Sequence, residues 1–290
     1  MFPALSVLPQ YLLPQRALTQ FAGWVARAQA GALTTALIRW FVRRYGVNMA
    51  EAEQADLAQY SSFNQFFTRA LAAGARPLQP ATWICPVDGA ISQCGPVLQG
   101  QLFQAKGHHY SSTALLGGDA ELAAEFADGA FATVYLSPRD YHRIHMPCDA
   151  TLRRMVYVPG DLFSVNPKTA RAVPGLFARN ERVVCVFDSA HGPLALVLVG
   201  ATIVGSVATV WHGTVNPPRT PSARVWDYPA GQVVLRQGEE MGRFLLGSTV
   251  VLLWPAPGVD FAAAWAPGAA VQLGQRMAEP GAPTRPAVGP

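Results

Sequence analysis

The stretch "LALVLVGATIVGSVATVW", residues 194–211, decides the fold class, because 18 residues without a charge fit either a membrane-spanning helix or buried strands. Val, Ile and Thr dominate it, Gly200 and Gly205 interrupt it, and the turn-like "DSAHGP" precedes it. Branched residues and interrupting glycines favour strands over a helix. The sequence therefore predicts two consecutive buried strands here.

Other short apolar runs, punctuated by Gly, Pro and Asp, extend this pattern from residue 83 onward: "AFATVYL", "RRMVYV", "RVVCVF", "QVVLR" and "TVVLLW". Such spacing is typical of an antiparallel core. Upstream, residues 15–45 and 62–75 read as helical. We expect an α+β fold, with N-terminal amphipathic helices (residues 1–75) followed by a predominantly antiparallel β core (76–278). The last residues, "EPGAPTRPAVGP" (279–290), are predicted to form a disordered tail.

The composition is apolar, and its positive charge is concentrated near the N-terminus. Hydrophobic residues make up 50% and charged residues 14%, against roughly 25% charged in an average soluble domain. The net charge is +4, yet the first 50 residues contain five arginines and no acid, so the rest carries 17 basic against 18 acidic residues. This asymmetry suggests an anionic partner, either nucleic acid or a membrane surface. The arginines are Arg16, Arg27, Arg39, Arg43 and Arg44.

A stripe of largely apolar residues at helical spacing, in a segment without any acidic residue, favours an amphipathic helix at a membrane surface: Leu33, Leu37, Trp40, Phe41 and Arg44. The alternative is that this stripe packs on the protein's own core. No secretory signal is recognised at the N-terminus, where prolines interrupt the apolar residues. The four cysteines are widely spaced without a C-x-x-C motif, which favours reduced thiols in a cytoplasmic protein.

Candidate proton-transfer residues gather in "YLSPRDYHRIHMPCDA" (135–150), directly after a predicted strand. His142 and His145 lie among charged residues there. In an extended strand their side chains would point to opposite faces, whereas a turn could bring both to one site. Histidines that only make loop hydrogen bonds are the alternative, and two histidines alone are a weak metal signal. Asp88, in the turn "CPVDGAIS" (85–92), becomes interesting if it orients a histidine.

The stretch "GRFLLGSTVVLLW" (242–254) places Gly247, Ser248 and Thr249 inside an apolar run. A β-bulge is one explanation. The other is that the Gly247–Ser248 peptide bond is itself a reactant, since glycine permits strained backbone and a neighbouring hydroxyl can attack the carbonyl. A histidine base oriented by a carboxylate would remove the hydroxyl proton.

A family resemblance is carried by six segments that occur in the right order along the chain: "LGST" (246–249), "PVDG" (86–89), "LSPRDYHRIHMP" (136–147), "YVPGDLFSVN" (157–166), "LFARNER" (176–182) and "VGATIVGSV" (199–207). From about residue 10 to about residue 257, the chain resembles phosphatidylserine decarboxylases of the bacterial membrane-associated type. The resemblance implies a precursor that cuts itself between Gly247 and Ser248 into a β chain (1–247) and an α chain (248–290). Ser248 would become a pyruvoyl group.

The resemblance also assigns residues. Asp88 and His145 match the family's charge-relay partners for Ser248, and His142 matches a residue for proton transfer during decarboxylation. Lys106 and His109, in "AKGHHYS" (105–111), are placed near the substrate headgroup, with a loop of no ligand role as the alternative. The pyruvoyl carbonyl would form a Schiff base with the substrate amine and accept the electrons left by CO₂. PLP has the same role in other decarboxylases. No metal or PLP is therefore expected.

The implied partners are an anionic phospholipid membrane and phosphatidylserine, which the enzyme would convert to phosphatidylethanolamine in phospholipid biosynthesis. We expect a peripheral protein on the cytoplasmic side of the cell membrane, a β/α chain heterodimer with a dimer of these left open, and no nucleic acid. Two other classes stay open from the residues alone. One is a non-catalytic peripheral lipid-binding protein; the other is a serine hydrolase, which lacks support from a G-x-S-x-G motif.

Overall fold

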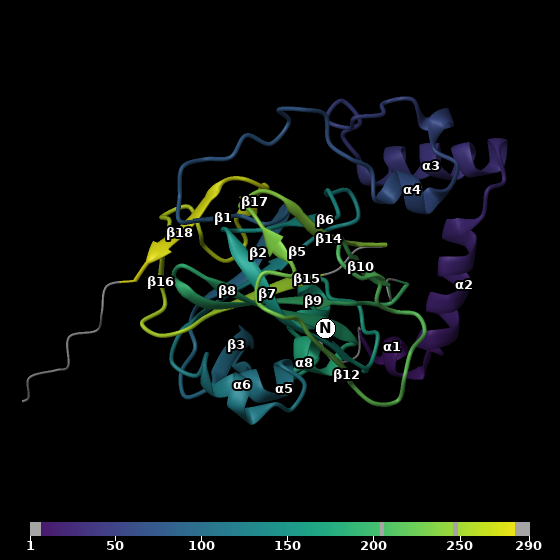
Figure 1. Ribbon diagram of the computed structural model, residues 1–290. Coiled ribbons are helices and arrows are strands. Elements are labelled where there is room, and N and C mark those ends of the chain that lie inside the picture. Colours follow the sequence, from purple (N-terminus) through teal and green to yellow (C-terminus); the bar gives the residue numbers. More distant parts are fainter. Residues whose placement is uncertain (1–6, 204–205, 246–248, 282–290) are drawn as a thin grey trace, which may run out of the picture.

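A large antiparallel sheet forms the centre of the protein (Figure 1). The computed structural model describes residues 7–203, 206–245 and 249–281. Eight strands of the large sheet follow the order β12 (Arg224–Asp227), β7 (Ala150–Val158), β8 (Arg182–Ser189), β9 (Gly192–Val199), β15 (Thr249–Trp254), β5 (Ala130–Tyr135), β2 (Gly89–Pro96) and β17 (Ala270–Val271). The ninth described strand, β13 (Val234–Leu235), also pairs with β7, and all the pairings in this sheet are antiparallel.

The central strands are apolar on both faces because both faces are covered. In β15, Val250 and Leu252 belong to one buried cluster, while Val251 and Leu253 belong to another. Alternate side chains of a strand point to opposite faces, so a strand covered on both sides reads as a continuous apolar run. The uncharged stretch at 194–211 is explained in this way: it contains β9 and the short strand β10 (Val207–Thr209), as predicted.

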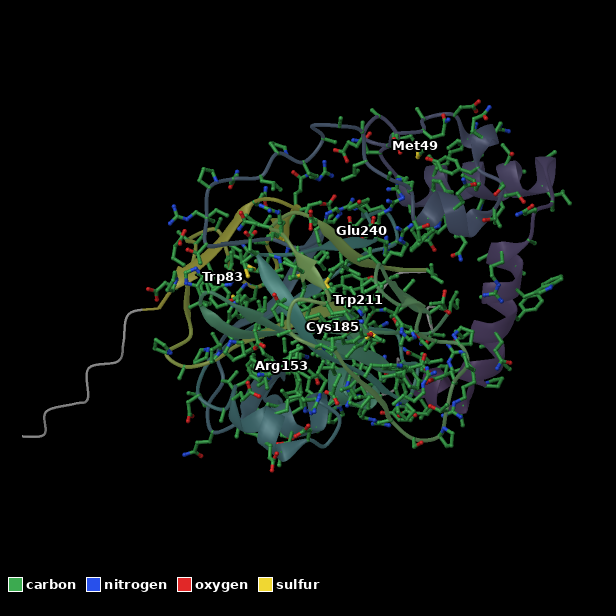
Figure 2. All side chains as sticks on the ribbon, in the orientation of Figure 1. Met49, Trp83, Arg153, Cys185, Trp211 and Glu240 are labelled. Atoms are coloured by element: carbon green, nitrogen blue, oxygen red, sulfur yellow. The ribbon has the colours of Figure 1, made fainter. Side chains whose placement is uncertain are left out.

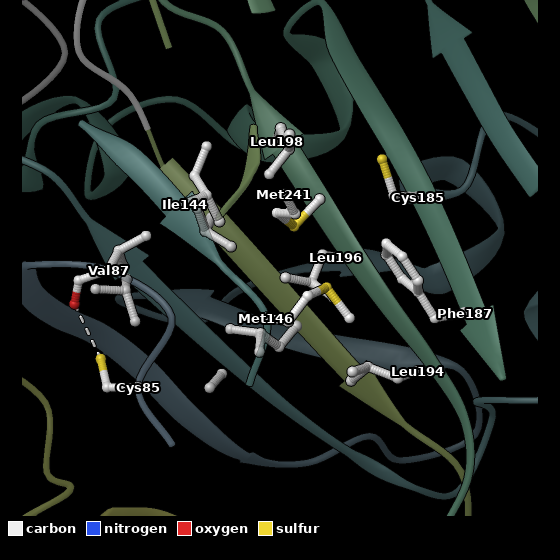
Figure 3. Packing of buried hydrophobic residues seen from close by; sticks show 14 of the residues in the cluster. Cys85, Val87, Ile144, Met146, Cys185, Phe187, Leu194, Leu196, Leu198 and Met241 are labelled. Atoms are coloured by element: carbon white, nitrogen blue, oxygen red, sulfur yellow. Dashed lines mark hydrogen bonds between the residues drawn. The ribbon is translucent and has the colours of Figure 1, made fainter. Parts of the chain in front are cut away.

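A four-stranded sheet packs on one face of the large sheet. It has the order β11 (Gly213–Thr214), β10, β14 (Glu240–Phe244) and β6 (Arg143–His145). Figure 3 shows Ile144 of β6 and Met241 of β14 packed near Leu196 and Leu198 of β9, all within one buried cluster. The small sheet therefore carries the predicted histidine segment on a fully packed support.

Shorter elements complete the core. A three-stranded sheet has the order β1 (Trp83–Ile84), β18 (Arg276–Pro280) and β16 (Val259–Phe261), and β3 (Gln101–Ala105) pairs with β4 (His108–Ser111). β18 contains Glu279 and Pro280, so the first two residues of the predicted tail belong to a strand; residues 282–290 lie outside the described part. The other face of the large sheet is covered by α5 (Ser112–Leu115), α6 (Ala120–Ala124), α7 (Pro167–Ala170) and α8 (Leu176–Arg179).

A small helical unit lies at one side of the β core (Figure 1). It comprises α2 (Gln15–Arg27), α3 (Ala32–Tyr45), the 3₁₀ turn η1 (Leu57–Gln59) and α4 (Phe63–Phe67). The preceding helix, α1 (Leu8–Leu12), lies against the β core, where Gln10 Nε2 donates to Thr169 Oγ1 (3.2 Å). The predicted helix at 15–45 is broken between α2 and α3, where Gly31 adopts a left-handed φ of 55°. Ile38, Phe63, Phe66 and Phe67 give this unit a core of its own.

The helix predicted at 62–75 is wrong in its length, because α4 ends at Phe67. Beyond it the backbone pairs with a distant segment instead of continuing the helix. Glu53 N–H donates to Ala70 O (3.0 Å), and Ala72 N–H donates to Glu51 O (2.9 Å). Tertiary pairing has overridden the helix propensity of the alanine-rich sequence.

The amphipathic stripe of α3 divides between core and surface. Leu37 and Phe41 pack against the small helical core, whereas Leu33 is 75% and Trp40 is 56% exposed. Part of the stripe therefore packs on the protein's own core, and the membrane-surface interpretation of its exposed part stays a prediction. Within the described residues, every helix is too short or too polar to cross a lipid bilayer.

Candidate active site

The strand register gathers the predicted catalytic segments at one edge of the large sheet. Thr249, the first residue of β15, pairs with Tyr135 at the end of β5, and Tyr135 pairs on its other side with Ala90 of β2. Because these strands are antiparallel, the starts of β15 and β2 meet the end of β5. Asp88 immediately precedes β2, and Thr249 immediately follows the predicted cleavage position. Residues 247–248 themselves lie outside the described part of the chain.

His142 is fully buried beside the strand that leads to the cleavage position. Its carbonyl oxygen accepts a hydrogen bond from the N–H of Phe244, the last residue of β14 (3.1 Å). Its ring lies 4.1 Å from the ring of Phe67, measured between centroids. Nδ1 lies 2.8 Å from the carbonyl oxygen of Asp140, and since a carbonyl only accepts, Nδ1 carries the proton. Nε2 is therefore the basic nitrogen of a neutral ring.

Burial keeps His142 neutral. The pKa of this imidazole falls from 6.5 to about 3: desolvation lowers it most, the hydrogen bond to Asp140 opposes this, and the charge of the nearby Arg69 guanidinium adds to the lowering. Within the described residues, His142 Nε2 and Thr249 Oγ1 are both buried without a hydrogen-bond partner. Buried polar atoms normally have a hydrogen-bond partner, so these two atoms beside the cleavage segment indicate a site for a further polar group.

His145 is the second neutral histidine, at the end of β6. Its Nδ1–H donates to the carbonyl oxygen of Gly238 (2.7 Å), and its Nε2 accepts from the hydroxyl of Tyr141 (3.0 Å). Burial lowers its pKa below the ordinary value. Its backbone N–H donates to Pro86 O (2.9 Å), which ties this histidine to the turn that carries Asp88. As an extended strand predicts, the rings of His142 and His145 have different neighbours.

Asp88 is held by an arginine that sequence reasoning missed. Arg76 donates to both carboxylate oxygens, with Nε 3.0 Å from Oδ1 and Nη2 2.6 Å from Oδ2, and it also reaches Glu51 at 2.8 Å. Leu273 N–H donates to Asp88 Oδ1 (2.9 Å). No hydrogen bond joins Asp88 to His145 among the described contacts, although the carboxylate raises the pKa of His145 slightly, through its charge. Arg76 thus connects the N-terminal unit to this carboxylate.

A second arginine also joins the helical unit to the site. Arg143 Nε donates to the carbonyl oxygen of Thr68, just after α4, and its Nη1 pairs with Glu240 of β14 (both 2.9 Å). Glu240 lies on the side of the β core that faces the helical unit, where Met49 marks that unit (Figure 2). The N-terminal helices are therefore positioned by ionic and polar contacts to the same segments that carry the histidines.

An apolar hollow of about 470 Å³ opens between the helices and this sheet edge. We call it the apolar hollow. Its walls come from α2, α3, α4 and the end of β5, and include Phe21, Val25, Phe41, Phe67 and Tyr135. Because Phe67 touches His142 and Tyr135 pairs with Thr249, the hollow reaches the edge where the predicted catalytic segments meet.

Lys106 and His109 are not brought to this edge. Both are exposed on the β3–β4 hairpin, with Lys106 in the turn and the ring of His109 against Phe103 of the same hairpin. In Figure 1 this hairpin lies beside α5 and α6, away from β6, β14 and α4. Their role near a headgroup stays a prediction. Across the described ranges, no three His, Cys, Asp or Glu side chains converge as metal ligands would.

Comparison with known proteins identifies the chain's relatives. The family model described as phosphatidylserine decarboxylase matches residues 63–279, and a second model, described as PSD, matches residues 5–46. A protein of Albidiferax ferrireducens is 69% identical over 96% of this chain and 98% of its own length, and one of Azoarcus sp. is 68% identical over 95% and 96%. Both are named phosphatidylserine decarboxylase proenzyme.

These matches define the class first: the chain is a decarboxylase, a lyase that releases CO₂. It belongs to the phosphatidylserine decarboxylase family. The family and the enzyme class predicted from the motifs are thus confirmed. Gly238, whose carbonyl orients His145, could not be found from the sequence, because every residue type has a backbone carbonyl. Tyr141 lay inside the histidine motif and could have been found there.

Proposed function

We propose that this chain is a proenzyme that cuts its own backbone between Gly247 and Ser248 and then converts phosphatidylserine to phosphatidylethanolamine and CO₂. Family membership supports the overall reaction. The observation that carries the site assignment is the register that brings the start of β15, the end of β5 and the start of β2 together. The products would be a β chain (1–247) and an α chain (248–290) that remain together as a heterodimer.

In self-cleavage, His145 serves as the base that takes the hydroxyl proton of Ser248. Its Nδ1–H is fixed by Gly238 O, so the lone pair of Nε2 is the atom that accepts a proton, once the hydroxyl of Tyr141 gives way. A lowered pKa keeps it unprotonated at neutral pH, which a base requires. Asp88 acts through its negative charge, which stabilises the imidazolium formed when the proton arrives.

The cofactor would be a pyruvoyl group derived from Ser248. When formed, it supplies a carbonyl that condenses with the substrate amine and withdraws the electrons released with CO₂. The residues present fit such a group, because His142 Nε2 and Thr249 Oγ1 are buried polar atoms with no partner among the described residues. In the decarboxylation, Nε2 of His142, which carries no proton in the resting ring, first accepts a proton and then passes it on, while Phe67 and burial exclude water from the ring.

The apolar hollow accommodates the acyl chains of the substrate. Its lining by Phe21, Val25, Phe41 and Phe67 offers an apolar surface next to the reactive edge. The docking surface is the exposed side of α2 and α3, where Trp24 and Trp40 accompany the arginines of α3. Aromatic and cationic side chains together favour an anionic bilayer surface. We therefore place the enzyme peripherally on the cytoplasmic face of the cell membrane.

Intact mass and denaturing electrophoresis of the purified protein test the proposal. We expect two fragments divided at Gly247–Ser248, with the smaller fragment lacking a free N-terminal amine. Ser248→Ala should remain full length and inactive, and His145→Ala should stall cleavage. Ser222→Ala, which changes an exposed loop serine, is the matched control and should be cut normally. A Ser248→Ala protein that is still divided at this bond would overturn the mechanism.

A further inference from the structure

A second hollow, of about 400 Å³, lies on the other face of α2. We call it the polar hollow. Gln20, Gly23 and Arg27 line it from α2, whereas Phe21 and Val25 of the same helix line the apolar hollow. Spacings of three and four residues place each set on one side of the helix. A single helix thus separates an apolar site from a polar one.

The lining of the polar hollow suits an anion. Arg27 and Arg219 contribute guanidinium groups, Asn64 and Ser206 contribute hydrogen-bonding groups, and none of its lining residues is Asp or Glu. Arg219 is already paired with Glu181, the residue just before β8 (2.8 Å). Arg27 has no ion pair within the described chain, so it is the cation whose charge a ligand would balance. Guanidinium groups bind phosphate and carboxylate oxygens with strong, directed hydrogen bonds.

Gly23 explains how Arg27 comes to lie along this wall. A Cβ built at Gly23 would lie 3.2 Å from Nη1 of Arg27, closer than side chains normally approach. The guanidinium therefore lies back over the helix surface at Gly23. Glycine is disfavoured inside a helix, and room for this side chain is a reason for its presence.

Asn64 adds an unmatched acceptor to the same hollow. It lies on α4, and its Oδ1 is buried without a hydrogen-bond partner among the described residues. A buried carbonyl oxygen of this kind requires a donor. A ligand with both an acidic oxygen group and an N–H group would therefore satisfy two features of this hollow that the protein leaves open.

The polar hollow is also lined by the last described residue before the predicted cleavage position. Leu245, three positions before Ser248, lines it, and the Leu245 N–H donates to Ser206 O (3.0 Å). Ile203 lines both hollows, so the two adjoin at this residue. One amphiphile could therefore place an apolar part in one hollow and an anionic part in the other.

We propose that the polar hollow is the subsite for the phosphodiester headgroup of the phospholipid substrate, with Arg27 pairing with an acidic oxygen and Asn64 accepting from a headgroup N–H. This assignment rests on the proposed function, which supplies the substrate. The acyl chains then occupy the apolar hollow, and the headgroup amine is presented to the segment that follows Leu245.

The test compares Arg27→Gln with Arg16→Gln in the self-processed enzyme. Both changes remove one positive charge from α2, but Arg16 does not line the hollow, so it controls for the net charge. The substrate is short-chain phosphatidylserine in neutral detergent micelles. We expect KM of Arg27→Gln to be about tenfold above that of Arg16→Gln, equivalent to about 1.4 kcal/mol, with little change in kcat. Arg27→Lys should recover most of the loss. Equal KM values for the two Gln variants would overturn the assignment.

Soluble anions separate a headgroup site from a general anion site. Glycerophosphoserine should inhibit the wild-type enzyme competitively, about tenfold more strongly than inorganic phosphate, and this advantage should disappear in Arg27→Gln. Equal inhibition by the two anions would exclude a site built for the lipid headgroup. Failure of the proposed function is visible earlier, because the wild-type protein would then be uncut or would yield no phosphatidylethanolamine.

Discussion

Replacing Arg76 by Met should destabilise the protein strongly, because it breaks an ion pair that has little access to water. The side chains of Arg76 and Asp88 are 8% and 9% exposed, and the guanidinium donates twice to the carboxylate. Asp88 correspondingly raises the pKa of Arg76. Methionine keeps the long apolar stem and removes only the charge and its hydrogen bonds.

The magnitude follows from what each carboxylate loses. Asp88 would keep the N–H of Leu273 as its hydrogen-bond donor, and leaving one buried charge without its partner typically costs about 3–5 kcal/mol. Glu51 is 34% exposed and can be hydrated instead, so its share is at most about 1 kcal/mol. Since Asp88 keeps one donor, we expect about 3–4 kcal/mol in total, which a domain of typical stability survives.

Urea unfolding followed by tryptophan fluorescence measures this loss, in a Ser248→Ala background so that the chain stays whole. Arg154→Met is the matched control, since Arg154 also joins two carboxylates, Asp119 and Asp227, but is 36% exposed. That change should cost at most about 1 kcal/mol. Adding Asp88→Asn to Arg76→Met should recover about 2 kcal/mol, because the unpaired charge is gone. The reasoning is refuted if the two arginine variants lose equal stability, or if Asp88→Asn recovers nothing.

Other measurements address the histidine and the docking surface. Burial holds the pKa of His142 at about 3 in the folded protein, below its ordinary 6.5. Between pH 3 and pH 6.5 the unfolded chain therefore binds up to one more proton than the folded protein. The free energy of unfolding falls as the pH drops through this window, by up to about 1.4 kcal/mol per pH unit. His142→Phe should remove that slope; urea midpoints with the same pH dependence as the parent would contradict the neutral, buried state. Replacing Arg39, Arg43 and Arg44 by Gln should weaken binding to anionic vesicles in sedimentation, by about 1 kcal/mol per charge, and not to neutral ones. Unchanged binding to anionic vesicles would remove α3 from the docking surface.

The β core was predictable because its strands are buried on both faces. Runs such as 194–199 and 249–254 contain apolar side chains that alternate between the buried clusters on the two faces of the large sheet. Each run therefore predicts a strand from its own residues alone. The helix predicted to extend to residue 75 failed for the opposite reason. Its ending depends on the pairing of Ala70 and Ala72 with residues some twenty positions earlier, and no local pattern records that pairing.

The residues of the site could be predicted from the sequence, but their hydrogen-bond and ion-pair partners could not. His142 and His145 could be named from one motif, and Asp88 from another. Arg76 could not be named as the partner of Asp88, because the two residues are twelve positions apart without a shared helix or strand, and their pairing depends on the tertiary fold. The carbonyl of Gly238 was equally invisible, since any residue type supplies one.

The position of β15 in the sheet determines whether folding or cleavage comes first. The strand lies between β9 and β5 and is hydrogen-bonded along both sides, so a break just before Thr249 would leave the new chain end clamped in the middle of the sheet. Folding must then come before cutting, since the bond has to be whole while the sheet is assembled around it. After cleavage the protein consists of two separate polypeptide chains, which must associate again if the enzyme is to refold after denaturation. We therefore expect the mature enzyme to refold far less readily on dilution from urea than its uncut parent.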